Sequence, residues 1–465
     1  MHSKTSNSLF YSLLAIVFLL PIPLGANRPW AWSFFQMAIF ALTIFSTYQF
    51  RHKPWLGMQA YTSMFYFWLS LIIIALLQII ALPEFLVGFL SPKALEIQQM
   101  ADAQQFYLSL DIGQSIISFF KLLAYFCMFC CVLMLVTDEN RLKLLLLTIV
   151  ATGTFQALYG AFEILLGFEN SLIFGFEVSN SATGSFVYRN HYANFLMMCA
   201  AAGIGLLVTS LQKNRNTSPK DMLRSIATTM LSSKALIRIS IAIMVIGLVM
   251  SRSRMGNTAF FVAMTIVGFA SLYLIKNKSK GLSFLVISMF IIDLLIVSAY
   301  FGLDKIQERL VQTSLQQESR DEVLVDASRM IFDFPLTGTG GGSFYSTFPG
   351  YQSAEVHSFY DHAHNDYIQM IIEYGLPSIF IMAFMMMFTL YKAARPMYRR
   401  QNSIFKGTSF ACSMVMIGML VHMTVDFPLQ AFANATYFSV FIALTMIINS
   451  LKINRQQKER RPAQK

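Results

Sequence analysis

Five Asp, His and Asn side chains crowd into residues 361–367, whose sequence is Asp-His-Ala-His-Asn-Asp-Tyr. A strongly apolar stretch follows at once and predicts a membrane helix that starts near Ile368. A neutral imidazole can take a proton from a sugar hydroxyl, and a neighbouring carboxylate can orient the ring. Because ionisable groups at membrane depth usually mark chemistry, this segment is the first candidate for a catalytic site.

Within this segment, His364 and His362 are the candidate general bases. Two other interpretations remain open, namely a solvated polar loop and a metal site built from His362, His364 and Asp361. We expect Asn365 and Asp366 to fix the loop or to bind a substrate hydroxyl rather than to catalyse.

Arginines at the ends of predicted spans are the second set of candidates. Arg252 and Arg254 share the short turn Ser-Arg-Ser-Arg-Met-Gly at 251–256, and Arg189 opens another span on the same side. A guanidinium group suits a pyrophosphate because its paired N–H donors match the phosphate oxygens. The alternative is that these side chains reach towards lipid head groups or anchor a helix end.

The longest outer loop, residues 302–363, is acidic overall, with nine acidic and four basic side chains. Its arginines Arg320 and Arg329 could bind the ligand or form local salt bridges, and His357 adds a third outer histidine. The spacing of the apolar residues predicts one or two short helices along the membrane surface. The glycine-rich run 338–342 predicts a hinge, since no Lys-Ser/Thr follows it as a nucleotide-binding loop requires.

Three acids, Glu163, Asp293 and Asp426, lie in or beside predicted spans. Buried acids in membranes often serve proton relays or ion sites, and they are the main support for a transporter. No pair of interrupted spans at matching positions indicates the inverted repeats of a transporter. A structural hydrogen-bonding role is therefore the favoured interpretation for each acid.

The composition decides the fold class. Hydrophobic residues make up 55% of the 465 positions and charged residues only 13%, and apolar stretches recur. Stretches of about 20 residues span a bilayer, so we predict an all-α polytopic membrane protein in which 1–465 form a single membrane domain. The sequence predicts about twelve spans, near residues 8–25, 30–49, 62–82, 113–136, 142–166, 190–211, 235–251, 257–275, 282–301, 365–391, 405–426 and 430–450. The large loop 302–363 then lies between the ninth and tenth spans.

The net charge of +11 is explained by orientation. Most of the 35 Lys and Arg fall on one side of the predicted spans, as the positive-inside rule requires, and this places both termini in the cytoplasm. Lys121 is an exception, since it lies within a span. The basic balance is therefore topogenic, and we expect no nucleic-acid partner.

The chain offers no disulfide framework and no zinc-ligand spacing, because its five cysteines lie within apolar stretches. At the N-terminus, Pro21, Pro23 and Gly25 lead to no clear small-residue cleavage site. We therefore expect an uncleaved first span rather than a signal peptide.

Several segments together resemble the signature region of the O-antigen ligase and O-antigen polymerase superfamily. The strongest matches are Asp-Phe-Pro-Leu-Thr-Gly-Thr-Gly-Gly-Gly-Ser-Phe at 333–344, Asp-His-Ala-His-Asn-Asp-Tyr-Ile-Gln at 361–369 and Glu-Tyr-Gly-Leu-Pro at 373–377. Supporting matches are Tyr-Arg-Asn-His-Tyr-Ala at 188–193, Ser-Arg-Met-Gly at 253–256 and His-Met-Thr-Val-Asp-Phe-Pro-Leu at 422–429. The combination covers roughly residues 185–430, whereas the first five spans match only in character.

The resemblance implies a GT-C-like glycosyltransferase of the bacterial inner membrane that needs neither metal nor cofactor. Its donor would be a glycan on undecaprenyl pyrophosphate, used on the periplasmic side. By position, the family histidine that precedes Asn falls on His364, and the family arginines that hold the donor pyrophosphate fall on Arg254 and Arg320. Met255 stands where the family often has Gly, so the choice between Arg254 and Arg252 stays open. Many relatives replace His362, which therefore ranks second.

The acceptor decides the exact activity. It is lipid A core for a ligase, a growing glycan for a polymerase, or a protein hydroxyl for an oligosaccharyltransferase. Membrane lipids and other polysaccharide-assembly proteins are further candidate partners. The rival function is a transporter or flippase for lipid-linked saccharide, which would tolerate the loss of His364.

Overall fold

The computed structural model describes residues 2–51, 58–178, 180–211, 233–275, 281–284, 286–288, 325–353 and 360–451, together with residues 291 and 323. Asp293, Arg320 and His357 lie outside the described residues, as does most of the predicted span at 282–301.

The described chain is an all-α membrane protein, as the composition predicts. Nine of its helices are long and apolar enough to cross a bilayer. They are α2 (Pro29–Phe50), α3 (Met58–Ile79), α6 (Ile112–Leu135), α7 (Glu139–Leu165), α8 (Arg189–Leu211), α11 (Arg254–Leu274), α16 (Leu376–Arg399), α17 (Ser403–His422) and α18 (Phe432–Ser450). The apolar parts of α1 (His2–Leu19) and α10 (Ser233–Met250) are shorter. Each predicted span outside 282–301 thus has a matching helix, and the few described residues of 282–301 are helical.

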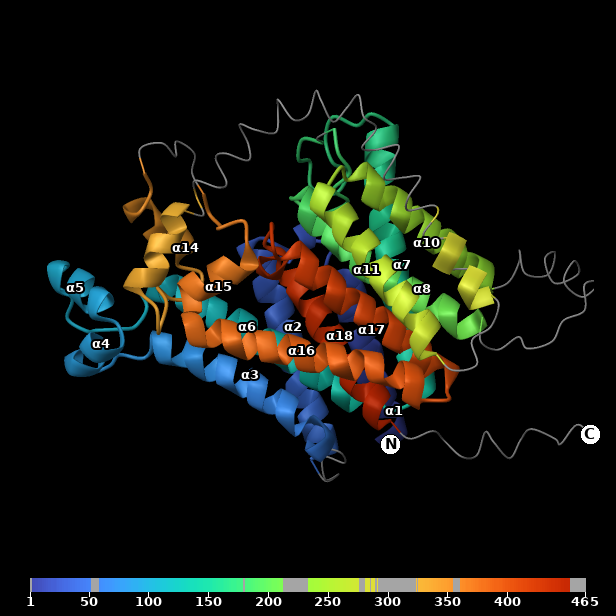
Figure 1. Ribbon diagram of the computed structural model, residues 1–465, viewed down its shortest axis with the longest axis horizontal. Helices are drawn as coiled ribbons and strands as arrows, with labels where there is room; N and C mark the ends of the chain where they lie inside the picture. Colours follow the sequence, from blue (N-terminus) through green and yellow to red (C-terminus); the bar gives the residue numbers. More distant parts are fainter. Residues whose placement is uncertain are drawn as a thin grey trace, which may run out of the picture.

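Helices α17 and α18 form the centre of the bundle. Helices α7, α8, α10 and α11 lie on one side of them, here called the α8 flank, and α2, α3 and α6 lie on the other, here called the α6 flank (Figure 1). Helix α17 packs closely against α8 because Gly205 and Gly407 let the two backbones approach each other. Helix α18 packs against α6. Both flanks are therefore fixed to one buried core.

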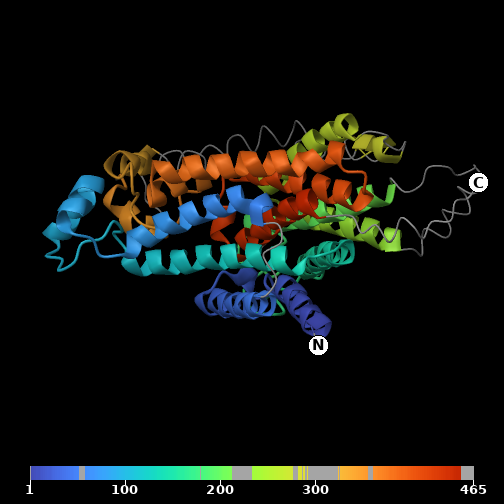
Figure 2. The ribbon, with the colours of Figure 1, turned by 90° about the horizontal axis from the view of Figure 1, so that it is seen from below.

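Helix α16 runs along the outside of this core (Figure 2). Its exposed face carries Phe380, Phe384, Met387 and Tyr391, which recur every three or four residues. Such a stripe covers one side of a helix, and a bilayer would solvate it.

The predicted span at 365–391 is wrong as a continuous helix. The structure has two helices there, α15 (Asp366–Tyr374) and α16, which meet at Gly375. Gly375 has φ 78° and ψ 169°, a conformation that side-chain-bearing residues rarely adopt, and Pro377 lies in the first turn of α16. The break turns α15 away from the axis of α16, so the helix that follows the polar segment does not span the membrane.

The glycine run 338–342 docks onto this break. Backbone N–H groups of Thr339 and Gly340 donate to the carbonyl oxygens of Ile372 and Glu373 at 2.7 and 3.0 Å, and Leu376 N–H donates to the Pro335 carbonyl at 2.8 Å. The run is thus held by α15 through backbone hydrogen bonds, which accounts for its small residues without a bound phosphate.

Short helices cover the end of the bundle that carries the polar segment 361–367. They are η1 (Leu24–Ala26), α4 (Glu84–Leu90), α5 (Pro92–Met100), α14 (Phe344–Thr347), η2 (Phe348–Gly350) and η3 (Pro428–Gln430). Residues 325–333 are helical, which confirms a short helix in the long outer loop. Val323, Met330, Phe344 and Ile372 share a small apolar core with Ala363, and this core fixes the polar segment 361–367 beside α15.

Candidate functional site

The ring of Phe427 brings three distant segments together. Its centroid lies 4.3 Å from the ring of His362 and 4.9 Å from that of His364. On the α8 side, Tyr188 stacks on it at 5.6 Å and His191 meets it edge-on at 4.9 Å. The segments 188–193, 361–369 and 422–429, all singled out from the sequence, therefore meet at one side chain.

The polar segment is held in place by the start of α15. The Asn365 side chain accepts hydrogen bonds from the N–H groups of Tyr367 and Ile368 at 3.0 and 3.1 Å and donates to the Thr424 carbonyl at 2.7 Å. His364 has φ 51°, so the chain turns sharply just before this cap. The role of Asn365 in this structure is to fix the geometry of the loop.

Asp366 joins the same loop to the turn after α17. Its N–H lies 3.1 Å from the carbonyl oxygens of Met423 and Asp426, and its carboxylate accepts from the N–H of Leu429 at 2.9 Å. Burial raises the pKa of Asp366 well above its ordinary range. Asp366 is 3% exposed, so its principal contacts are with the protein backbone.

His362 is held in one tautomer by Gln369. The Gln369 side-chain oxygen accepts from the N–H of Ala363 at 3.2 Å, so its NH2 group faces His362 Nδ1 at 3.0 Å and Glu373 at 3.0 Å. An Nδ1 atom that accepts a hydrogen bond leaves the proton of a neutral ring on Nε2. Burial lowers the pKa of His362 to about 4, so the ring is neutral near pH 7 and presents an N–H towards Asp361, 4.0 Å away.

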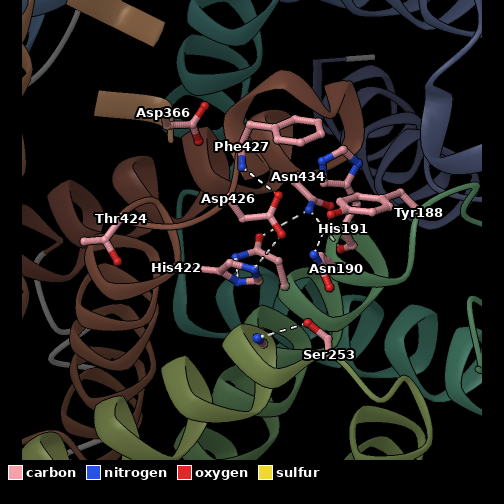
Figure 3. A network of polar contacts seen from close by, with 12 residues as sticks. Tyr188, Asn190, His191, Ser253, Asp366, His422, Thr424, Asp426, Phe427 and Asn434 are labelled. Carbon is pink, nitrogen blue, oxygen red and sulfur yellow. Dashed lines mark hydrogen bonds and ion pairs between the residues drawn. The ribbon is translucent and has the colours of Figure 1, made fainter. Parts of the chain in front are cut away.

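A buried polar network supports Phe427 from below (Figure 3). Asn434 donates to the Asn194 side-chain oxygen at 3.2 Å, which turns the NH2 group of Asn194 towards His422 Nδ1 at 3.1 Å. His422 Nε2 then faces an Asp426 oxygen at 3.7 Å, and the other Asp426 oxygen accepts from the N–H of Phe427 at 2.9 Å.

Asp426 is thus a structural acid. Both side chains of the His422–Asp426 pair are 1% exposed. Burial alone would raise the pKa of Asp426, but the ion-pair interaction with His422 outweighs it and holds the pKa below its usual value. Glu163 is also buried and accepts from the N–H of Leu172 at 3.3 Å. These contacts agree with structural roles for both acids.

Two of the candidate arginines open neighbouring helices on the α8 flank. Arg189 and Arg254 are the first residues of α8 and α11, and both are exposed. Gly256 in the first turn of α11 packs against Ala193 in the first turn of α8, so the two N-termini lie side by side. Helix N-termini present free N–H groups and a positive dipole end, which adds to the attraction of these arginines for an anion.

Arg252 faces a different environment from Arg254. It is exposed, has φ 51° and lines an open hollow of about 630 Å3 together with Glu163, Glu169 and Glu177. Three glutamates line the same hollow as Arg252, whereas Arg254 lies at a helix N-terminus. The structure therefore distinguishes the two arginines that the sequence left equivalent.

A cavity of about 440 Å3 lies on the α6 flank, beside the polar segment. Asp361, His362 and Asp366 line it, while no arginine of the α8 flank does. The described residues contain no group of three His, Cys, Asp or Glu side chains that could hold a metal ion. In this structure His362, His364 and Asp361 are not gathered as such a group.

Comparison with known families agrees with this geometry. The family described as O-antigen ligase matches residues 239–383, a range that includes Arg252, Arg254, His362 and His364. The match covers about a third of the chain and shows that this region is similar to the O-antigen ligase family. This similarity supports glycosyl transfer of the ligase or polymerase type. A search among proteins with curated functions gave no match.

Some residues of this matched region and its surroundings escaped the sequence analysis. Phe427 entered the sequence analysis only as part of the segment 422–429, and the adjacent residues give no indication that four rings contact its side chain. Gln369 and Glu373 had a usable signal, because the spacing of four places them on one face of α15. Lys121 also had one, because a lysine inside a span is costly unless it has a role.

Proposed function

We propose that this protein transfers a glycan from an undecaprenyl-pyrophosphate-linked donor to a hydroxyl of an acceptor on the periplasmic side of the bacterial inner membrane. The observation that carries the proposal is the convergence of three segments at Phe427. Two of the rings that contact Phe427, those of His362 and His364, belong to the region that matches the O-antigen ligase family. The excess of Lys and Arg on the opposite side supports cytoplasmic termini and an outward-facing site.

His364 is the proposed general base. It removes the acceptor proton while the hydroxyl oxygen attacks the anomeric carbon and the bond to the pyrophosphate oxygen breaks. His362 is the weaker candidate, because Gln369 occupies its Nδ1 atom and the proton stays on Nε2. His362 is better suited to donate a hydrogen bond to the acceptor sugar.

Arg254 and Arg189 are the proposed ligands of the donor pyrophosphate. As the glycosidic bond breaks, negative charge develops on the pyrophosphate, and paired guanidinium N–H donors stabilise it. Their location beside two helix N-termini supports this role, and the glutamates that line the same hollow as Arg252 make it the weaker choice. Arg320 has the same role by resemblance alone. Attack from the face opposite the pyrophosphate inverts the anomeric centre.

The test is glycan transfer in liposomes, with purified wild type and His364→Ala and a polyprenyl-pyrophosphate oligosaccharide as donor. Lipid-linked chains that lengthen with wild type alone support a polymerase, and transfer that requires added lipid A core supports a ligase. Equal transfer by His364→Ala contradicts the assignment of the base. Saccharide that crosses the bilayer without transfer contradicts the proposed function and favours the transporter.

A further inference from the structure

The cavity on the α6 flank has a charged mouth and an apolar floor. Arg28, Lys121, His362 and Glu373 line its mouth, where α2, α15 and α16 begin or end. Its floor is lined by Leu71, Met382, Met385, Met386, Phe438 and Ile442. On α16 and α18 these residues come about two to three turns after the helix starts, so the floor lies deeper along both helices.

Lys121 is the central cation of this mouth. It lies within a membrane span, and its ammonium group sits 3.9 Å from the centroid of the Trp32 ring. In the part of the chain that the structure describes, no salt bridge involves Lys121. A membrane-embedded lysine without an ion pair is costly, and an anionic ligand would offset that cost.

The acids around Lys121 oppose an anion less than their number suggests. Glu373 is 2% exposed and binds Gln369, and burial raises its pKa to about 7 despite the opposing effect of Lys121. Asp366 is buried as well, and Asp361 lines the cavity with 65% of its side chain exposed, so solvent screens its charge. With Arg28 and Lys121 on the other walls, the mouth attracts negative charge.

We infer that this cavity binds a second lipid-linked substrate, the acceptor, through a phosphate-bearing head group at Lys121 and Arg28 and a single apolar chain over the methionines of α16. This assignment rests on the proposed function. A volume of about 440 Å3 is within the range of about 300–1,000 Å3 for sites that hold one small ligand. It suits a head group and the first part of one prenyl chain better than a lipid with several acyl chains.

The location of the cavity fits an acceptor rather than the donor. His362 lines the cavity and touches one side of Phe427, whereas Tyr188, next to Arg189, stacks on the ring from the α8 flank. A lipid in the cavity and a pyrophosphate at the arginines would thus approach the histidines from opposite flanks. Two lipids can then be held at once without competing for one channel.

The test is photo-crosslinking of the full-length protein in nanodiscs with a prenyl pyrophosphate whose chain ends in a benzophenone. Peptide mass spectrometry should find label on α16 and α18 at the cavity floor. Lys121→Gln should lower this label by about tenfold or more, because hydrogen bonds to charged groups have that effect on affinity. Lys121→Arg, which keeps the charge, should restore it.

Lys93→Gln is the matched control, since Lys93 is an exposed lysine of α5 paired with Glu96 at 2.9 Å. It should leave the label unchanged, and Arg254→Ala should lower only label outside the cavity. Absence of label from α16 and α18, or equal label in wild type and Lys121→Gln, would overturn the inference. Displacement of the probe by lipid A as readily as by unlabelled prenyl pyrophosphate would overturn the single-chain assignment.

Crosslinking needs no turnover, so it separates the two proposals. Label in the cavity from a protein that transfers no glycan would leave the site standing and contradict the proposed function. Glycan transfer by a protein whose cavity takes no label would support the proposed function and contradict the cavity site.

Discussion

The α8 flank reaches Phe427 through Tyr188, and the cavity on the α6 flank reaches it through His362, but the two flanks offer different chemistry to a lipid-linked ligand. The α8 flank presents exposed arginines at the starts of two helices. The α6 flank encloses its cation within a cavity that has an apolar floor. An open cationic edge suits a leaving group on which charge develops, whereas an enclosed amphiphilic site suits a substrate that must be positioned.

The largest expected effect comes from the residue between the two flanks. His364→Ala should lower the transfer rate by about 100-fold to 10,000-fold, because a general base contributes that much, and should leave binding of both lipids unchanged. Single-turnover transfer and crosslinking measure the two quantities separately. A variant that binds donor poorly but transfers at a normal rate once saturated would place His364 among the binding residues instead.

The buried network of Asn194, His422, Asp426 and Asn434 should keep Phe427 and the segments that contact it in their relative positions. Asp426→Ala removes the partner of His422 and of the Phe427 N–H, and should lower the free energy of unfolding by about 3 kcal/mol. Asp138→Ala is a suitable comparison, since Asp138 caps α7 from an exposed position and should cost about 1 kcal/mol. Thermal unfolding in detergent measures both, and equal losses would contradict a special role for the network.

The two arginines of the 251–256 turn provide a matched pair on the α8 flank. Arg254→Ala should lower kcat/KM for the donor by about 10-fold to 100-fold, since it removes a charged hydrogen bond to pyrophosphate. Arg252→Ala should change it by less than about threefold, because Arg252 shares an open hollow with three glutamates, whose negative charge disfavours pyrophosphate there. Steady-state rates at varied donor concentration measure both effects. A larger loss of kcat/KM in Arg252→Ala than in Arg254→Ala would show that the hollow beside Arg252 belongs to the donor site.

The smallest expected effect is a pH dependence confined to the α6 flank. The pKa of Glu373 is raised to about 7, so the carboxyl is largely protonated at pH 6 and ionised at pH 8. Ionised Glu373 competes with an anionic ligand for Lys121, so cavity labelling should fall several-fold as pH rises across this window. His362, with its pKa lowered to about 4, stays neutral throughout.

Glu373→Gln isolates this effect from the titration of the probe. A prenyl pyrophosphate changes its own charge near pH 6, and that change is common to wild type and the variant. The difference between their pH profiles therefore reports Glu373 alone. Identical profiles would mean that Glu373 does not influence the bound head group.

The sequence predicted the fold class and most spans because the length and apolarity of each stretch encode them locally. It missed the break at Gly375, although Gly followed by Leu-Pro is a typical signal for one helix ending and another beginning. The meeting of segments 188–193, 361–369 and 422–429 followed only from their resemblance to one family. Distances at Phe427 could not be predicted, because they depend on how helices distant in sequence pack.

The cavity was beyond prediction for the same reason. Its walls come chiefly from α2, α3, α6, α15, α16 and α18, with single turns from α14 and η3, and the sequences of these helices carry no common motif. Only Lys121 hinted at it, as a charge within a span. The distinction between Arg252 and Arg254 also needed the structure, because it depends on which neighbours each guanidinium meets.

The most direct test of the two-flank arrangement is the initial rate of transfer in liposomes over a matrix of donor and acceptor concentrations, for wild type, Arg254→Ala and Lys121→Gln. Arg254→Ala should raise KM for the donor alone, and Lys121→Gln should raise KM for the lipid-linked acceptor alone. If Lys121→Gln raises KM for the donor, or if each variant raises both constants equally, the two lipids do not occupy opposite sides of Phe427.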